Sequence, residues 1–350
     1  MEENHKFSNT LKMWYLINKR DLPWRKSKDP YFIWLSEIIL QQTRISQGTS
    51  YYEKFAGEFD DISALASAEE SHVLNLWQGL GYYSRARNLL STAKHIANEL
   101  NGEFPNTYKD LIKLKGIGDY TASAIASIAF DKPHATVDGN VYRVLARYFG
   151  ISTPINDTKG PKEFKELAQH LLDHEDPGTH NQALMEFGAL VCTPKNPKCT
   201  ACVFSPSCAA LQKGTVFSLP VKLKKLKIKN RYLNYMVLNN RDTNTRIRQR
   251  THKDIWQHLY EFPLYEADDI MMEHNEIEPL IAKEFNLKGS YTLKKYNNEP
   301  VVHKLTHQTL YASFWIIHTN ELIENTTDWK DLTQYALPVL LQNFVDKYQN

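Results

Sequence analysis

Four cysteines are the first chemical signature of this 350-residue chain, which contains no others. They lie in one short segment at the spacing C-x6-C-x2-C-x5-C, as Cys192, Cys199, Cys202 and Cys208. In a reducing cytosol, a tight group that holds every cysteine indicates a metal site rather than a set of disulfides. Structural zinc usually uses two C-x2-C pairs and this segment has one, but four thiolates suit both zinc and an iron–sulfur cluster. The cysteines alone therefore leave both metals open.

The segment Leu114–Ala122 offers a second kind of site, because Gly116 and Gly118 lie two residues apart. Glycines at this spacing permit a tight turn between helices, and the small residues that follow let the next helix pack closely. Such a turn leaves backbone N–H groups at a helix N-terminus free to face an anion, for example a DNA phosphate. The pattern predicts a helix-hairpin-helix turn, although an ordinary turn between helices can carry the same glycines.

The elements that must position these sites divide the chain into two halves. Over residues 1–214 apolar residues recur at spacings of three and four, which predicts a mainly helical domain. A basic segment, 215–230, follows; we interpret it as a solvated linker, with phosphate contact as an alternative. Over 231–350, short alternating runs at 232–238 and 309–317 and a helix-like segment near 276–285 predict a smaller α+β domain.

The N-terminus, the apolar stretches and the net charge bear on where in the cell the protein is expected. The N-terminus lacks the apolar run of a signal peptide, and no stretch of the sequence reaches the length of a membrane span. The net charge of +2 is too small to name a partner. We expect a cytoplasmic protein with no membrane partner, nucleoid-associated if the source is bacterial.

Further motifs give the chain a family resemblance. The hairpin, the segment around Asp138 and the cysteine loop follow one another at the separations of the endonuclease III superfamily. Bifunctional lyases of that superfamily carry, just beyond the hairpin glycines, a lysine whose amine forms an imine with the sugar, whereas this chain has Tyr120. The region from about 20 to 210 closely resembles the MutY-type adenine DNA glycosylases, through the further segments Leu22–Arg25, Trp34–Thr43, Gly79–Arg87 and Asn181–Leu184.

The resemblance implies a 4Fe-4S cluster on the cysteine loop, 192–208, and two carboxyl groups with different tasks. Glu37 lies among apolar residues, which raise a carboxyl pKa as a general acid near neutral pH requires, and it would protonate N7 of adenine. Asp138 would stay ionised and stabilise the sugar cation or attack it. Tyr120 and Asn140 are expected to hydrogen-bond Asp138. The ordinary alternatives are a solvated glutamate and an aspartate that only caps the next helix.

Access to adenine in a duplex requires base flipping, which costs least at a mismatch. The resemblance implies that Tyr82 inserts beside the base that stays stacked and that Gln42 hydrogen-bonds near it; Tyr82 as a core aromatic is the alternative. Side chains expected near the extrahelical adenine are Trp24, Arg25 and Gln182. Gly116 and Gly118 would hold a phosphate through backbone N–H groups.

The second half resembles, more weakly, the Nudix-like C-terminal domain of the same family. It lacks the glutamate-rich box of an active Nudix hydrolase, so pyrophosphatase activity is not expected. In the family, a Phe-Ser-His loop reads 8-oxoguanine opposite the target adenine. This chain has Leu305, Thr306 and His307, which keep a hydroxyl and an imidazole and lose the aromatic ring. Strand-end polar residues are the alternative interpretation of Thr306 and His307.

Together these features predict a monofunctional glycosylase of base excision repair. It would act as a monomer on double-stranded DNA that contains adenine opposite 8-oxoguanine or guanine. Two alternatives remain at this point: an endonuclease III-like bifunctional lyase, which Tyr120 disfavours, and a non-catalytic iron–sulfur DNA-binding protein.

Overall fold

The chain forms two compact units in a computed structural model, which describes residues 2–223, 228–268 and 272–349. The first unit contains residues 1–68 and 87–224, and the second contains 69–86 and 225–350. Part of the predicted linker, 224–227, lies outside the described residues, and strand β1 begins at Lys229. Within the described ranges, every helix is too short or too polar to cross a membrane.

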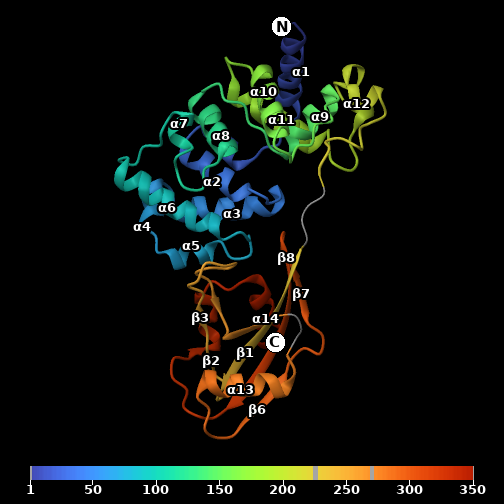
Figure 1. Ribbon diagram of the computed structural model, residues 1–350. Coiled ribbons are helices and arrows are strands. Elements are labelled where there is room, and N and C mark those ends of the chain that lie inside the picture. The colour runs from blue at the N-terminus through green and yellow to red at the C-terminus, as the bar shows by residue number, and fades with distance from the viewer. Residues whose placement is uncertain (1, 224–227, 269–271, 350) are drawn as a thin grey trace. The chain divides into compact units, whose positions relative to one another are not determined.

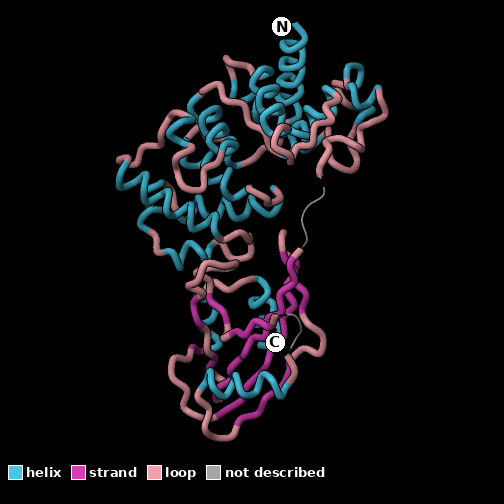
Figure 2. The backbone as a smooth tube through the Cα atoms, viewed as in Figure 1, coloured by secondary structure: helices cyan, strands magenta, loops and turns pink. Residues whose placement is uncertain are grey.

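The first unit is helical, as Figures 1 and 2 show. Helix α6 begins in the second unit and runs into the first. The elements of the first unit are α1 (Glu2–Asn18), η1 (Pro23–Arg25), α2 (Pro30–Leu40), α3 (Ile45–Glu58), α4 (Ile62–Ser67), α6 (Ser84–Glu99), α7 (Tyr108–Leu111), α8 (Asp119–Phe130), α9 (Gly139–Phe149), α10 (Gly160–Leu171), α11 (Pro177–Leu190), η2 (Cys199–Ala201), η3 (Ser205–Ser207) and α12 (Ala209–Gln212).

Local sequence signals explain where the helices that carry the site begin. Asp29 caps α2 by accepting a hydrogen bond from the backbone N–H of Tyr31, and Pro30 occupies the first helical position. Asp138 caps α9 by accepting from the N–H groups of Asn140 and Val141. Each cap satisfies N–H groups that have no partner inside their own helix. The two acidic caps therefore fix the start of α2, which carries Glu37, and of α9, which carries Asn140.

Helix α11 lies close to two neighbouring helices at its glycines. A Cβ added to Gly178 would come within 2.8 Å of the Ser127 carbonyl oxygen on α8, and one added to Gly188 within 2.7 Å of the Asn140 Cβ on α9. No real Cβ tolerates such distances without a shift of backbone. The absence of a side chain at these positions therefore permits α8, α9 and α11 to meet around one site.

The second unit combines a mixed sheet with helices. Strands β1 and β8 pair in parallel along their whole length, from Lys229 opposite Gln308 to Asn240 opposite Thr319. Other strands pair antiparallel with them. The elements are α5 (Glu70–Leu76), β1 (Lys229–Asn240), β2 (Asn244–Thr245), β3 (Arg248–Gln249), β4 (Tyr260–Glu261), β5 (Leu264–Ala267), α13 (His274–Phe285), β6 (Tyr291–Lys295), β7 (Val301–Lys304), β8 (Gln308–Thr319), β9 (Thr327–Asp328), η4 (Trp329–Gln334) and α14 (Val339–Gln349).

Alternation along β1 produces two cores. Tyr235 and Val237 pack with Phe344 of α14, whereas Met236 and Leu238 pack with residues of α13. Successive side chains of a strand point to opposite faces, so both faces of this strand are buried. The predicted strands at 232–238 and 309–317 and the predicted helix near 276–285 are confirmed, and the strands extend further than predicted.

Candidate active site

Glu37 and Asp138, which lie about a hundred residues apart in sequence, line the same cavity of about 180 Å³ in the first unit. Glu37 comes from the last turn of α2, and Asp138 is the N-cap of α9. Tyr120 from the first turn of α8 and Asn140 also line the cavity. The structure therefore brings together the four residues that the sequence proposed as catalytic.

Burial makes Glu37 a weak acid. Glu37 is half-buried at the wall of the cavity, and burial raises the pKa of its carboxyl to about 7 because the ionised form loses hydration. A hydrogen bond with Tyr120 opposes this effect, the negative charge of Asp138 adds to it, and Arg25 lowers the pKa slightly. A carboxyl with a pKa near 7 holds its proton in part of the population at neutral pH, as a general acid must.

Asp138 has a different set of partners. Burial raises the pKa of Asp138 above the ordinary value of an aspartate. Its oxygens accept hydrogen bonds from the N–H groups of Asn140 and Val141 at 2.9 and 2.8 Å and from the Asn140 side-chain amide at 2.7 Å. These bonds and the charge of Arg143 oppose the effect of burial because they stabilise the carboxylate.

Tyr120 departs from its predicted contact. Its hydroxyl hydrogen-bonds Glu37 and also lies 3.1 Å from the sulfur of Met185, whereas it was expected to bond Asp138. The phenol is half-buried at the wall of the cavity, and its pKa is raised well above the usual value by burial and by the nearby charges of Glu37 and Asp138. It therefore stays a neutral donor to Glu37 and affects Asp138 only as a neighbour.

A charged network, which the sequence analysis missed, borders the same cavity. Glu186 of α11 is 1 % exposed and accepts hydrogen bonds from the guanidinium groups of Arg20 and Arg25 at 2.6–3.1 Å. Although burial acts in the opposite direction, these donors hold the pKa of Glu186 down at about 2. Gln182, four residues earlier on α11, accepts a hydrogen bond from the Tyr15 hydroxyl. The spacing of Gln182 and Glu186 on one helix face was the signal that could have revealed Glu186.

Trp24, Arg25 and Gln182 all line the catalytic cavity, as proposed for an extrahelical base. Trp24 is almost completely buried and packs edge-on against Tyr52. Its ring thus supplies a fixed apolar wall, while Arg25 and Gln182 supply polar groups.

Arg143 connects the start of α9 with the cysteine loop. Its guanidinium donates to the Asn140 side-chain oxygen at 2.8 Å and to the carbonyl oxygens of Gly188 and Cys192 at 2.7 and 2.6 Å. Arg147, one turn later, donates to the Thr193 carbonyl oxygen and lies 3.5 Å from the Cys192 sulfur. Neither arginine was proposed from the sequence, where the i, i+4 spacing of the two arginines after Asn140 was the available signal.

The four cysteines line one small apolar cavity, together with Arg147 and Lys198. All four are partly buried, and no disulfide joins them. Within the described ranges, no three histidine, cysteine, aspartate or glutamate side chains converge as they would around one metal ion.

The predicted hairpin has the backbone that its glycines permit. Gly116 has a φ of +79°, and Gly118 is the N-cap of α8 without a side-chain cap. Asp119, the first residue of α8, is a negative charge where an anion would approach. It is paired with Lys165, whose ammonium lies 2.9–3.0 Å from both carboxylate oxygens and also donates to the Ala135 carbonyl oxygen.

The residues proposed to act on the base stack have exposed side chains on strained backbone. Gln42 follows α2 with a φ of +56°, and Tyr82 has a φ of +50° and is 46 % exposed. A side chain at positive φ costs free energy that the surrounding fold must supply. The exposure of Tyr82 excludes the alternative of an ordinary core aromatic.

Thr306 and His307 lie in the turn between β7 and β8 of the second unit. The Thr306 hydroxyl hydrogen-bonds the Tyr82 hydroxyl, which belongs to the same unit. His307 is exposed, and its carbonyl oxygen accepts from the N–H of Lys229. A strand-end turn thus presents Thr306 beside Tyr82.

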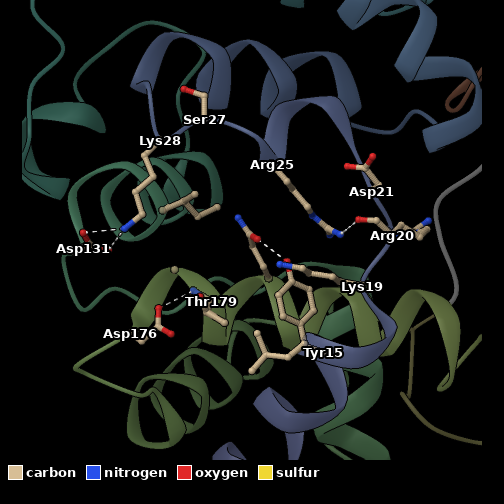
Figure 3. Close-up of a pocket in the computed structure, with 14 residues that line it drawn as sticks. Tyr15, Lys19, Arg20, Asp21, Arg25, Ser27, Lys28, Asp131, Asp176 and Thr179 are labelled. Carbon is tan, nitrogen blue, oxygen red and sulfur yellow. Dashed lines mark hydrogen bonds and ion pairs between the residues drawn. The ribbon is translucent and has the colours of Figure 1, made fainter.

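A second cavity of about 320 Å³ adjoins the catalytic one (Figure 3). Arg20, Arg25, Ile128 and Gln182 line both cavities. Elsewhere its wall contains ion pairs and polar groups, among them the contact of Lys28 with Asp131 at 3.0 Å. No motif in the sequence indicated a site at this cavity.

Comparison with known proteins identifies the two regions. Residues 35–173 match the HhH-GPD superfamily of base excision DNA repair proteins, and residues 234–347 match the NUDIX domain. These matches confirm the predicted helix-hairpin-helix and Nudix-like domains.

Full-length relatives extend this result. Adenine DNA glycosylases from Buchnera aphidicola of Schizaphis graminum and of Baizongia pistaciae are 36 % and 37 % identical, over 87 % and 97 % of this chain and 85 % and 96 % of theirs. The human adenine DNA glycosylase is 43 % identical over 59 % of this chain and 40 % of its own.

Solved structures show the same fold in the helical region. A thermostable thymine-DNA glycosylase is 32 % identical with a TM-score of 0.56, over 61 % of this chain and 98 % of that one. An endonuclease III in a DNA complex, 19 % identical with a TM-score of 0.52 over 60 % and 97 % of the two chains, shares the fold. The full-length relatives and the matched domains together place the chain in the adenine DNA glycosylase family, within the HhH-GPD superfamily of base excision DNA repair proteins.

Proposed function

We propose that this protein is a monofunctional glycosylase that hydrolyses the bond between adenine and deoxyribose in mispaired duplex DNA. The observation that carries the proposal is the pair of carboxyl groups in one cavity, Glu37 with a pKa near 7 and Asp138 held by three N–H donors. Adenine needs a proton to leave, and the sugar needs a compensating negative charge. The pair supplies both.

In the proposed reaction, protonated Glu37 gives its proton to N7 of adenine. The C1′–N9 bond then breaks, and its electron pair stays on N9 of the neutral base. The Asp138 carboxylate stabilises the positive sugar, either by charge alone or by a bond to C1′. Water adds to C1′ and gives a proton to the Glu37 carboxylate, which restores the acid. With Tyr120 in the lyase position, the chain has no amine there to form an imine.

Binding of DNA would use the hairpin and the two exposed side chains at positive φ. The N–H groups at the start of α8 would hold a phosphate after the Gly116 turn. Tyr82 would insert into the stack, with Gln42 near the remaining base, and the displaced adenine would enter the cavity. These roles are supported by the exposure of Tyr82 and Gln42.

The cysteine loop would suit the 4Fe-4S cluster that the family resemblance implies. Its four thiols line one apolar cavity, and such clusters are held by four cysteine thiolates. Cys192, Cys199, Cys202 and Cys208 would hold the cluster, which ties the loop into one rigid piece.

Recognition of 8-oxoguanine opposite the adenine is proposed for the turn that contains Thr306 and His307. Both are polar, and Thr306 contacts Tyr82, the proposed inserting residue. The Thr306→Ala and His307→Ala variants should cleave adenine opposite guanine as the wild type does and lose part of the preference for 8-oxoguanine. Equal preference in both variants and wild type would reject this assignment.

A gel assay tests the main proposal. Enzyme in excess is incubated with duplex containing adenine opposite 8-oxoguanine, and strand breaks are compared with and without alkali. Breaks at the adenine only after alkali support a monofunctional glycosylase; breaks without alkali would indicate a lyase, and none a binding protein. The Glu37→Gln variant should bind the duplex and release no adenine.

The similarity to a thymine-DNA glycosylase makes thymine opposite guanine the second substrate to test. A protonated carboxyl favours a purine, because thymine has no N7 to accept the proton. We therefore expect cleavage at adenine and not at thymine.

A further inference from the structure

The second cavity follows the catalytic cavity along two helices. On α8, Tyr120 lines the catalytic cavity, Ile128 lines both, and the capping residue Asp131 lines the second. On α11, Glu186 lines the catalytic cavity, Gln182 both, and Thr179 the second. Two independent helices thus place the second cavity directly beyond the catalytic one.

The order of the lining residues along α8 also places the second cavity away from the hairpin. The hairpin glycines precede α8, whereas Asp131 ends it, so the length of the helix, ~18 Å, separates them. A duplex held at the hairpin would lie at the first end of α8, where Tyr120 lines the catalytic cavity. The second cavity opens at the other end of α8.

The residues that line both cavities offer polar and apolar contacts suited to a neutral purine. Gln182 offers an amide, Arg25 lies over the Tyr15 ring at 5.5 Å, and Ile128 is apolar. At about 320 Å³, the cavity falls in the range of small-molecule sites, roughly 300–1,000 Å³. Its own charges are largely paired, for example Lys28 with Asp131, so it carries no strong attraction for the DNA backbone.

We propose that the second cavity is the passage through which free adenine leaves after cleavage, while the abasic DNA is still bound. The inference rests on the proposed function and adds a route for its product. Gln182 and Arg25, which line both cavities, form the boundary that the base crosses. Leu16 of α1 and Lys28 of the segment before α2 line the second cavity alone, and Figure 3 shows Lys28 beside Asp131.

Matched tryptophan variants test the passage. Leu16 and Lys28 line the cavity and are 57 % and 70 % exposed, so Leu16→Trp with Lys28→Trp narrows it from two sides without touching the catalytic residues. The control is Ile17→Trp with Lys26→Trp, at the exposed neighbours that do not line it. Lys26 matches Lys28, since it is 67 % exposed and also has a surface ion pair. Both variants lose one positive charge.

Cleavage and release are measured separately on duplex with tritiated adenine, with enzyme in excess. Alkaline quenching counts cleaved strands, and rapid gel filtration counts adenine still bound to the protein. We expect equal cleavage in both variants and release slowed about tenfold in the narrowed one, which corresponds to ~1.4 kcal/mol on the exit barrier. Leu16→Trp alone should show a smaller delay in the same direction.

Cleavage with equally fast release in the narrowed and control variants would overturn the passage and leave the proposed function intact. Adenine that leaves only when the DNA dissociates, in every variant, would also overturn it. A wild-type protein that cleaves nothing would refute the proposed function itself, and the passage with it.

Discussion

The hydrogen bond from Tyr120 to Glu37 should set the pH at which the enzyme loses activity. A donor to the carboxylate stabilises the ionised form, so it lowers the pKa of Glu37 against the larger effect of burial. Tyr120→Phe removes the donor and keeps the ring. The pKa of Glu37 should therefore rise above its value of about 7.

The size of the effect follows from the strength of such a bond. A hydrogen bond to a charged group contributes about 1.5 kcal/mol or more, which corresponds to about one pKa unit. The proposed reaction needs protonated Glu37, so activity should fall as pH rises through this pKa. At pH 8 a carboxyl with a pKa of 7 is about one-tenth protonated and one with a pKa of 8 about half. The alkaline limb of the variant should shift upward by about one pH unit.

The assay is the single-turnover cleavage rate between pH 5 and 9.5 with enzyme in excess, so that DNA release does not contribute. Only the midpoint is compared, because loss of the phenol can change the absolute rate. Tyr31→Phe is the control: Tyr31 lies on the same helix as Glu37, and its hydroxyl donates to the Phe59 carbonyl oxygen. An unshifted or lowered midpoint in Tyr120→Phe would refute Glu37 as the titrating acid.

Three further variants test other contacts of the first unit. Arg143→Met leaves buried carbonyl oxygens without donors and should lower the free energy of unfolding by about 3 kcal/mol, measured by urea denaturation. Lys165→Gln removes the cation that is paired with Asp119 at the hairpin, and it should weaken DNA binding about fivefold, or ~1 kcal/mol for a half-exposed charge. A second substitution in the same chain, Asp119→Asn, should restore the affinity. Failure of this rescue would argue against the pairing of Lys165 with Asp119. Lys198→Glu, at an exposed position of the cysteine loop, should reduce the slope of log affinity against log salt by about 1; an unchanged slope would place this loop away from the phosphates.

Short-range patterns carried most of what the sequence could predict. Period-two alternation identified β1 and β8, and apolar spacing identified the helices, because these signals depend on which face of an element is buried. The cap at Asp138 was an expected alternative to catalysis, and the structure shows that one carboxylate serves as cap and as part of the cavity.

The contacts between distant segments were beyond the sequence. Glu186 and Arg20 are separated by more than 160 residues, and their ion pair exists only because α1 packs against α11. For the same reason, nothing in the sequence showed that Tyr120 reaches Glu37 rather than Asp138. Residue types in the sequence predicted which residues line the site, whereas the packing of the helices determines which of them form hydrogen bonds with each other.

The contact of Gly188 with Asn140 bears on how variants of this chain are judged. Alanine for glycine is the mildest change in any similarity table, and in most helices it is harmless. At position 188 the added methyl would push against the Cβ and the backbone of Asn140, whose amide holds Asp138. The substitution should therefore displace the Asn140 amide and misalign the Asp138 carboxylate, although a screen based on residue similarity would score it as benign.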